Sequence, residues 1–173
     1  EANRNQYLLA IEFTQNQTHL AWLDLTTGTF AIATDTHHEN LTPLIESLAP
    51  KEILIPEKSS EAWSQSENPW CDTFQYLKQN YTLTPIPDYH FDPIAGARTT
   101  CDTLDVLNLN GFGISGQHPA LGAAGAVLQY ASETLCNTPA NIKEIEEYKA
   151  SENLLIDPAT QQNLEIFKSA TNT

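Results

Sequence analysis

The sequence of 173 residues has few positive charges and no long apolar run. Only 8 residues are Lys or Arg, against 22 Asp and Glu, and the formal charge at pH 7 is −14. A surface this acidic repels phosphate groups, which argues against independent binding to nucleic acid or to an anionic membrane. The most apolar stretch, from Pro119 to Leu128, is too short to span a bilayer, so we expect no membrane partner.

The sequence is also poor in cysteine and has no methionine. Cys71, Cys101 and Cys136 are far apart and form no C-x-x-C pair. We interpret them as reduced, mostly buried thiols of a cytoplasmic protein. Because a complete translation product starts with Met, we expect the chain to be part of a longer protein.

What the sequence does contain is a change of hydrophobic period. Three β-type runs come first, and Gly28 is expected to supply the left-handed residue of the hairpin turn between the second and third. Helical and extended patterns then alternate. This order predicts an α/β fold with a mixed sheet flanked by helices, the order found in ribonuclease-H-like domains. The predicted strands lie at 7–13, 20–25, 29–34, 52–56 and 82–86, and the predicted helices at 41–48, 70–81 and from 93 onward.

The second half of the chain is expected to be mainly helical. The helix opened by Asp92-Pro93 places Ile94, Ala97, Cys101 and Leu104 on one side, which we expect to be its buried face. A strong helix is predicted from Pro119 to Leu135. The small residues at 122–126 indicate that another backbone approaches this helix closely. Residues 137–153 are interpreted as a polar connection, and 154–167 as a strand-like piece followed by a last helix.

The glycines Gly111, Gly113 and Gly116 form the pattern G-x-G-x-x-G. A dinucleotide-binding loop needs a buried strand directly before this pattern and a helix that begins at its last glycine. Here the preceding residues "VLNLN" are short and half polar, and Gly116 comes before His118-Pro119. We therefore interpret the glycines as a turn between two packed bodies, and keep a nucleotide-binding module as an alternative.

Carboxylates offer a second possible site. Ribonuclease-H-like nucleases hold two Mg²⁺ ions with carboxylates, and Glu12, Asp24 and Asp92 could be assigned to that role. However, Asp24 precedes a hairpin turn and Asp92 precedes a helix, and both positions explain a carboxylate without a metal. In "DTHHEN" (35–40) the adjacent histidines would point to opposite sides of an extended segment. We predict no catalytic, cofactor or metal site, with a metal-dependent nuclease as the alternative.

Four separated blocks, taken in order, resemble the bacterial MutS mismatch-repair proteins. The blocks are "LAWLDLTTGTF" (20–30), "PKEILIPE" (50–57), "LNLNGFGISG" with the helix that follows it, and "LLIDPATQQNLEIF" (154–167). In the last block Gln161 and Gln162 stand where the family usually has a basic pair. The resemblance runs from about Tyr7 to Phe167.

The resemblance implies a non-catalytic, ribonuclease-H-like connector domain at 1–116 and the beginning of the helical core, or lever, domain at 117–173. It implies a parent protein that recognises mismatched DNA, uses ATP and Mg²⁺ and acts as a homodimer. The F-x-E motif and the P-loop of the parent are absent from this chain. The connector would relay conformational change between the mismatch-binding and ATPase parts and help to dock MutL.

The resemblance also suggests where partners lie. Arg98, Thr99 and Thr100 are the residues that we assign to a partner-binding surface, because Arg98 is one of only eight basic residues. Gly111, Gly113 and Gly116 would lie at the junction between connector and core. The helix from Pro119 would pack on core helices outside this chain, so we expect its apolar side to be partly exposed.

Overall fold

The computed structural model describes residues 6–35, 38–136 and 142–149. These residues form six strands, four α-helices and three short 3₁₀ turns. The elements are β1 Tyr7–Phe13, β2 Thr18–Asp24, β3 Phe30–Asp35, α1 His38–Leu48, β4 Glu52–Pro56, η1 Ser59–Ser64, α2 Cys71–Asn80, β5 Leu83–Ile86, η2 Asp88–Phe91, α3 Pro93–Leu104, η3 Asn110–Phe112, α4 Leu121–Glu133 and β6 Glu146–Tyr148.

The strands form one mixed sheet in the order β5-β4-β1-β2-β3-β6. The pairs β1–β2 and β2–β3 are antiparallel, while β4, β5 and β6 each run parallel to their inner neighbour. The predicted mixed sheet with flanking helices is therefore confirmed, and Gly28 has the expected positive φ of 83°. The assignment to the ribonuclease-H-like class stays a prediction.

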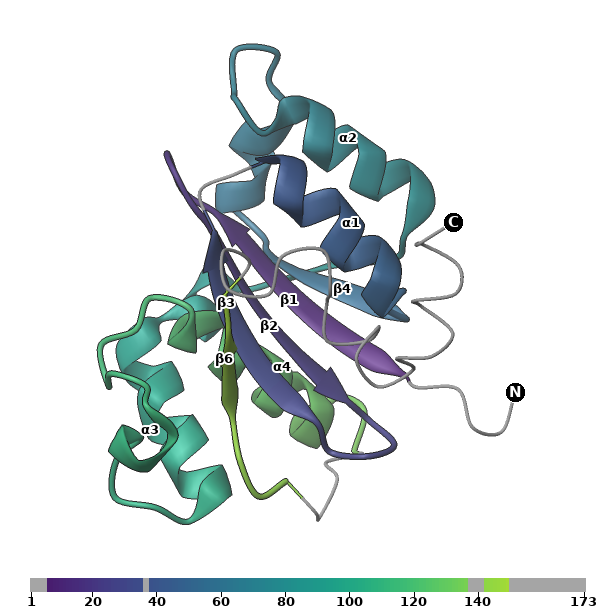
Figure 1. Cartoon of the computed structure of the whole chain (residues 1–173). Coiled ribbons are helices and arrows are strands. Elements are labelled where there is room, and N and C mark those ends of the chain that lie inside the picture. Colours follow the sequence, from purple (N-terminus) through teal and green to yellow (C-terminus); the bar gives the residue numbers. More distant parts are fainter. Residues whose placement is uncertain (1–5, 36–37, 137–141, 150–173) are drawn as a thin grey trace, which may run out of the picture.

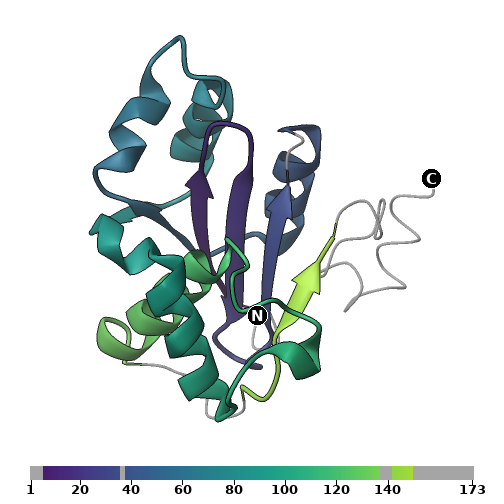
Figure 2. The same cartoon turned by 90° about the vertical axis from the view of Figure 1, so that its left-hand side faces the viewer.

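Helices cover both faces of the sheet. Helices α1 and α2 lie on one face, while α3 and α4 lie on the other (Figures 1 and 2). Each face of the sheet has its own hydrophobic core. Along β1, Leu9 and Ile11 lie in the core shared with α1 and α2, and Leu8 and Ala10 lie in the core shared with α3 and α4. All four side chains are at most 1% exposed. The continuous apolar run of this strand thus follows from burial on two faces.

The packing of α3 against α4 depends on glycine. A Cβ atom on Gly96 would lie 1.8 Å from the carbonyl oxygen of Leu121, and one on Gly122 would lie 2.0 Å from that of Phe91. A Cβ atom on Gly125 would lie 2.7 Å from the Cα of Gly96. The close backbone approach predicted from the small residues at 122–126 is therefore confirmed, and the backbone approached belongs to η2 and α3.

The buried side of α3 differs in part from the predicted one, since Leu104 is buried and Ala97 and Cys101 pack half-buried against the core. Ile94 is 71% exposed, whereas Gly96, Thr100 and Leu104 are buried. Only glycine permits the approach of α4, so the helix turns its small residues inward and leaves Ile94 in solvent. Asp92 does cap this helix, as predicted, because its Oδ2 accepts a hydrogen bond from the amide of Ala95 at 3.0 Å.

Helix α4 is also placed differently from the prediction. Its side chains from Leu121 to Leu128 are buried, and they share a core with β1, β2 and β3. The expected exposed apolar side was wrong, because the sheet and α3 cover it. Farther along, β6 joins the sheet in a segment interpreted as a polar connection. A separate all-α segment is thus not confirmed within the described residues.

The predictions about the cysteines, the C-terminal segment and membrane-spanning helices have different outcomes. Cys71 and Cys101 are only half-buried and Cys136 is exposed, so the prediction of mostly buried thiols was wrong, although all three are free. The strand and helix predicted over 154–167 lie outside the described residues, and the assignment of 117–173 to a second domain stays a prediction. No helix in the described ranges has the length and apolarity needed to cross a membrane.

Candidate functional site

The carboxylates considered for a nuclease site lie far from one another. Glu12 pairs with His19 at one end of the β1–β2 ladder, and Asp24 pairs with Tyr7 at the other end. The distance between the two ends is about 17 Å at ~3.3 Å per residue. The two side chains also point to opposite faces of the sheet, because side chains alternate along a strand. Two-metal catalysis requires ions about 4 Å apart, so this arrangement does not support a nuclease.

Asp24 stabilises the hairpin turn that follows it. Its Oδ1 accepts hydrogen bonds from the amide of Thr26 at 2.8 Å and from the Thr26 hydroxyl at 2.6 Å. The carboxylate is fully buried. In the described ranges, no group of three His, Cys, Asp or Glu side chains could hold a metal ion. The histidine-containing segment 35–40 is not extended throughout, since β3 ends at Asp35 and α1 begins at His38.

The glycine pattern lies on the exposed connection between α3 and α4. It follows α3 and includes η3, so no strand precedes it. Gly113 has a φ of 74°, a conformation that favours glycine, and a Cβ atom on any of the three glycines would meet nothing within 4 Å. The structural context of a dinucleotide-binding loop is therefore missing. The role of these glycines as a junction between domains stays a prediction.

One hollow on the surface brings two predicted regions together. It lies between α3 and the connection that follows it, and has a volume of about 410 Å³. Arg98, from the predicted partner surface, and Gly116, from the glycine pattern, both line it. The other lining residues are Ala97, Cys101, Asp102, Val106, Leu107, Asn108 and Leu109.

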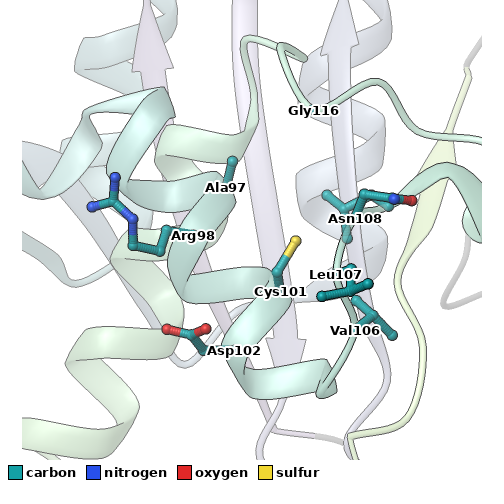
Figure 3. Close-up of a pocket in the computed structure, with 9 residues that line it drawn as sticks. Ala97, Arg98, Cys101, Asp102, Val106, Leu107, Asn108 and Gly116 are labelled. Carbon is teal, nitrogen blue, oxygen red and sulfur yellow. The ribbon is translucent and has the colours of Figure 1, made fainter.

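The hollow has an apolar wall and a charged rim. Figure 3 shows the sulfur of Cys101 pointing from α3 toward the side of the hollow where Asn108 lies, whereas Arg98 and Asp102 leave the helix on the side away from Leu107. Burial raises the pKa of the Cys101 thiol, and the charge of Asp102 adds to this effect. The thiol is therefore a poor nucleophile at neutral pH, and the hollow offers binding rather than covalent chemistry.

The predicted partner surface is only partly accessible. Arg98 is exposed and Thr99 is half-buried, but Thr100 is fully buried. Thr100 lies four residues after Gly96, on the side of α3 that faces α4, and its hydroxyl has no hydrogen-bond partner among the described residues. Thr100 therefore cannot contact a partner protein, and its place in the predicted surface was wrong.

Sequence reasoning missed the most exposed apolar side chain of this region. Leu107 is 98% exposed and lines the hollow beside the half-buried Val106. Single exposed apolar side chains are common on protein surfaces, but Leu107 adjoins the apolar wall of the hollow. The sequence carries no signal for it, because Leu107 is flanked by no helical or strand period and its exposure depends on how the segment after α3 folds.

A second group of titratable side chains lies at the far end of the sheet. Glu12 and His19 are paired on β1 and β2, and the Nδ1 of His19 lies 3.0 Å from the Thr34 hydroxyl. Burial raises the pKa of Glu12 to about 7, and the charge of Asp88 adds to it. Burial lowers the pKa of His19 to about 4, with a further contribution from His118. His19 is therefore neutral at pH 7 and Glu12 is only partly ionised.

A hydrogen bond ties the connection after the hollow to β6. The Nε2 of His118 lies 2.8 Å from a carboxylate oxygen of Glu147 on β6. The Nδ1 of His118 accepts a hydrogen bond from the amide of Ala120 at the start of α4. Because Nδ1 is an acceptor, Nε2 carries the proton and donates to Glu147. The segment that begins at Gly116 is thereby fixed between α4 and the sheet edge.

Comparisons with known proteins identify the relatives of this chain. The family model described as MutS domain II matches residues 6–163. The DNA mismatch repair protein MutS of Protochlamydia amoebophila (strain UWE25) is 34% identical to this chain over 152 residues. The aligned part covers 87% of this chain but only 17% of that relative. By sequence and by family model, this chain belongs to the MutS family and corresponds to its domain II.

Proposed function

We propose that this chain relays conformational change between the mismatch-binding and ATPase parts of a MutS-like protein and helps to dock MutL. The match to domain II over residues 6–163 is the observation that carries this proposal, because that domain is the non-catalytic connector of the family. The strand order and directions support the ribonuclease-H-like architecture that the family resemblance implies. Glu12 and Asp24 lie too far apart to share a metal ion, which agrees with a domain that binds a partner and transmits conformational change.

A relay needs a body that moves as a unit, and two features of the packing support this role. The sheet is covered on both faces, so its strands are held by two cores. In addition, α3 and α4 touch through backbone atoms at Gly96, Gly122 and Gly125. Closely packed interiors have low compressibility and transmit displacement, whereas loosely packed ones absorb it.

The parent protein supplies the remaining parts of the proposal. ATP and Mg²⁺ would bind to its ATPase, mismatched DNA would contact its other domains, and the parent would act as a cytoplasmic homodimer. The acidic charge of −14 supports a domain that does not grip DNA by itself. The isolated chain is expected neither to hydrolyse ATP nor to bind a mismatched duplex at 150 mM salt.

The test separates the relay from the docking. MutL from the same organism is titrated onto the isolated chain, and micromolar binding is expected if the chain helps to dock it. In the full-length parent, Gly122→Ala is expected to leave mismatch binding intact and to weaken the effect of mismatched DNA on ATP hydrolysis. Unchanged coupling in a variant whose α3–α4 packing is demonstrably loosened would overturn the relay.

A further inference from the structure

The sequence of β6 favours a strand only weakly. The strand has three residues, Glu146–Tyr148, and lies at the edge of the sheet, where it pairs in parallel with β3. Parallel pairing is slightly less stable per residue than antiparallel pairing, and glutamate is depleted in strands. The attachment of β6 therefore depends on contacts with the rest of the domain.

Two side chains of β6 make such contacts, one on each face of the sheet. Tyr148 and Glu147 point to opposite faces, because side chains alternate along a strand. The ring of Tyr148 makes an edge-to-face contact with the buried Trp22, at 5.9 Å between ring centroids, in the core shared with α1 and α2. Glu147 accepts a hydrogen bond from Nε2 of His118 at 2.8 Å. β6 is thus held from both faces.

His118 links β6 to the packed pair of helices α3 and α4. Its Nδ1 accepts a hydrogen bond from the amide of Ala120, and its carbonyl oxygen accepts one from the amide of Leu121. Helix α4 begins at Leu121, and one residue later Gly122 lies against the backbone of η2. Because closely packed elements move together, a displacement of α4 reaches β6 directly through the contact between His118 and Glu147.

The residues just before β6 are buried more deeply than β6 itself. Ile142 and Ile145 are 5% and 2% exposed and belong to the core shared with α3 and α4. In β6, by contrast, Glu146 is exposed and the other two residues are half-buried. Separation of β6 from β3 therefore leaves this core closed, and such a local opening costs less free energy than global unfolding.

We propose that β6 is a releasable edge strand, and that the contact between His118 and Glu147 sets how firmly it is attached to β3. While the contact is intact, movement of α3 and α4 passes into β6 and on into the rest of the parent. When the contact is broken, β6 separates from β3 and the transmission weakens. His118 is a positioning residue that acts through Glu147. This inference rests on the relay proposed above and adds the element through which the relay leaves the domain.

The first experiment measures amide hydrogen exchange of the 173-residue chain at pH 7 in low concentrations of urea. Local opening exposes little surface, so exchange in β6 is expected to depend only weakly on urea. Exchange in α4 is expected to depend on urea steeply, because its side chains are buried in the core and its amides open only when the domain unfolds.

His118→Asn removes one of the two hydrogen bonds of the imidazole. The Oδ1 of asparagine can still accept from the amide of Ala120 two residues on, but the shorter side chain does not reach Glu147. Exchange in β6 is expected to become about tenfold faster, the equivalent of about 1.4 kcal/mol for a hydrogen bond to a partly exposed charged acceptor. Glu147→Ala should have the same effect, and the double variant should add little to it.

Two matched controls are changes within β6. Glu146→Ala removes the neighbouring exposed carboxylate and is expected to keep exchange within about twofold of the unchanged chain. Glu147→Gln keeps a carbonyl oxygen that accepts from Nε2 of His118, so it is expected to retain most of the protection that Glu147→Ala loses.

The second experiment measures how much mismatched DNA changes ATP hydrolysis by the full-length parent. His118→Asn and Glu147→Ala are expected to reduce this effect by between about twofold and tenfold, because the coupling free energy falls by no more than the contact removed. Glu146→Ala and Glu147→Gln should leave the effect unchanged.

Each outcome has a separate meaning. If exchange in β6 depends on urea as steeply as exchange in α4, or is not faster in His118→Asn, the releasable strand is overturned. Faster exchange with unchanged coupling overturns the inference, while weakened coupling in Gly122→Ala would still support the relay. Unchanged coupling in Gly122→Ala and in both β6 variants overturns the relay and the inference together.

Discussion

Replacing Gly122 by alanine is expected to destabilise the domain, although the same change usually stabilises a helix. In an exposed helix interior, Gly→Ala gains about 1 kcal/mol. Here the added Cβ atom would lie 2.0 Å from the carbonyl oxygen of Phe91 and 3.3 Å from the nitrogen of Pro93. Both contacts are with backbone atoms, so no side-chain rotation relieves them.

The magnitude follows from how far the two helices must move. Because real Cβ atoms essentially never approach within 3.0 Å, α4 and η2 would have to separate locally by about 1 Å in a core packed at crystal-like density. Overpacking of this kind costs about 3 kcal/mol, at the upper end of the usual range. After the gain in helix propensity, the net loss is about 2 kcal/mol, which lowers the unfolding midpoint by roughly 4–8 °C for a chain of this size.

The assay is thermal and urea unfolding of the chain, followed by circular dichroism. Gly116→Ala is the matched control, because its Cβ atom would meet nothing within 4 Å and its φ is not positive. Its unfolding free energy is expected to change by less than about 0.5 kcal/mol. If Gly122→Ala proved as stable as the unchanged chain or more so, the close approach of α3 and α4 through backbone atoms would be refuted.

Three further outcomes are expected from unfolding measured between pH 4 and pH 8. The pKa of Glu12 is about 7 in the folded chain, against 4.5 for a free glutamate side chain, so the folded chain binds more protons than the unfolded one in this window. Glu12 therefore lowers the unfolding free energy as pH rises. Glu12→Gln should abolish this loss of stability, and an unchanged pH profile in that variant would contradict the argument. The pKa of His19 is about 4 in the folded chain, against 6.5 for a free histidine side chain, so the folded chain loses stability as pH falls through this window. His19→Gln should reduce that loss. Equal acid sensitivity in the variant and the unchanged chain would argue against a buried neutral imidazole. At pH 7, Asp24→Ala should lower the unfolding free energy by about 1–3 kcal/mol, because the Thr26 amide loses its hydrogen-bond acceptor. Asp24→Asn keeps the Oδ1 acceptor and should cost less. Equal losses of unfolding free energy in the two variants would show that the turn does not depend on this acceptor.

The parts of the fold that the sequence predicts well are those with a strong local signal. The apolar runs at 7–13 and 52–56 are confirmed as β1 and β4, and the Asp92-Pro93 start of α3 is confirmed by the cap. β6 was missed because Glu146–Tyr148 has no hydrophobic period of its own. This strand exists through its pairing with β3 and the edge-to-face contact of Tyr148 with Trp22, both of which depend on residues far away in the sequence.

The candidate site was predicted in part for a similar reason. Arg98 was assigned to a partner surface because a lone cation is conspicuous in an acidic sequence, and it lines the hollow, while its role as a partner contact stays a prediction. Thr100 was assigned to the same surface because periodicity alone does not show which side of a helix another backbone approaches. Leu107 was missed because its importance lies in its exposure, and exposure depends on how the segment after α3 folds back.

The glycines show why a motif has to be interpreted through its surroundings. Gly111, Gly113 and Gly116 match a nucleotide-binding pattern, yet a Cβ atom on any of them would meet nothing within 4 Å, and only Gly113 has a positive φ, of 74°. Gly96 and Gly122 match no motif, but each lies against a backbone carbonyl that leaves no room for a Cβ atom. The constraint on a glycine comes from what a side chain there would meet. In this chain, the positions where a Cβ atom has no room are therefore those of the α3–α4 contact. This contact holds the wall of the hollow against the sheet.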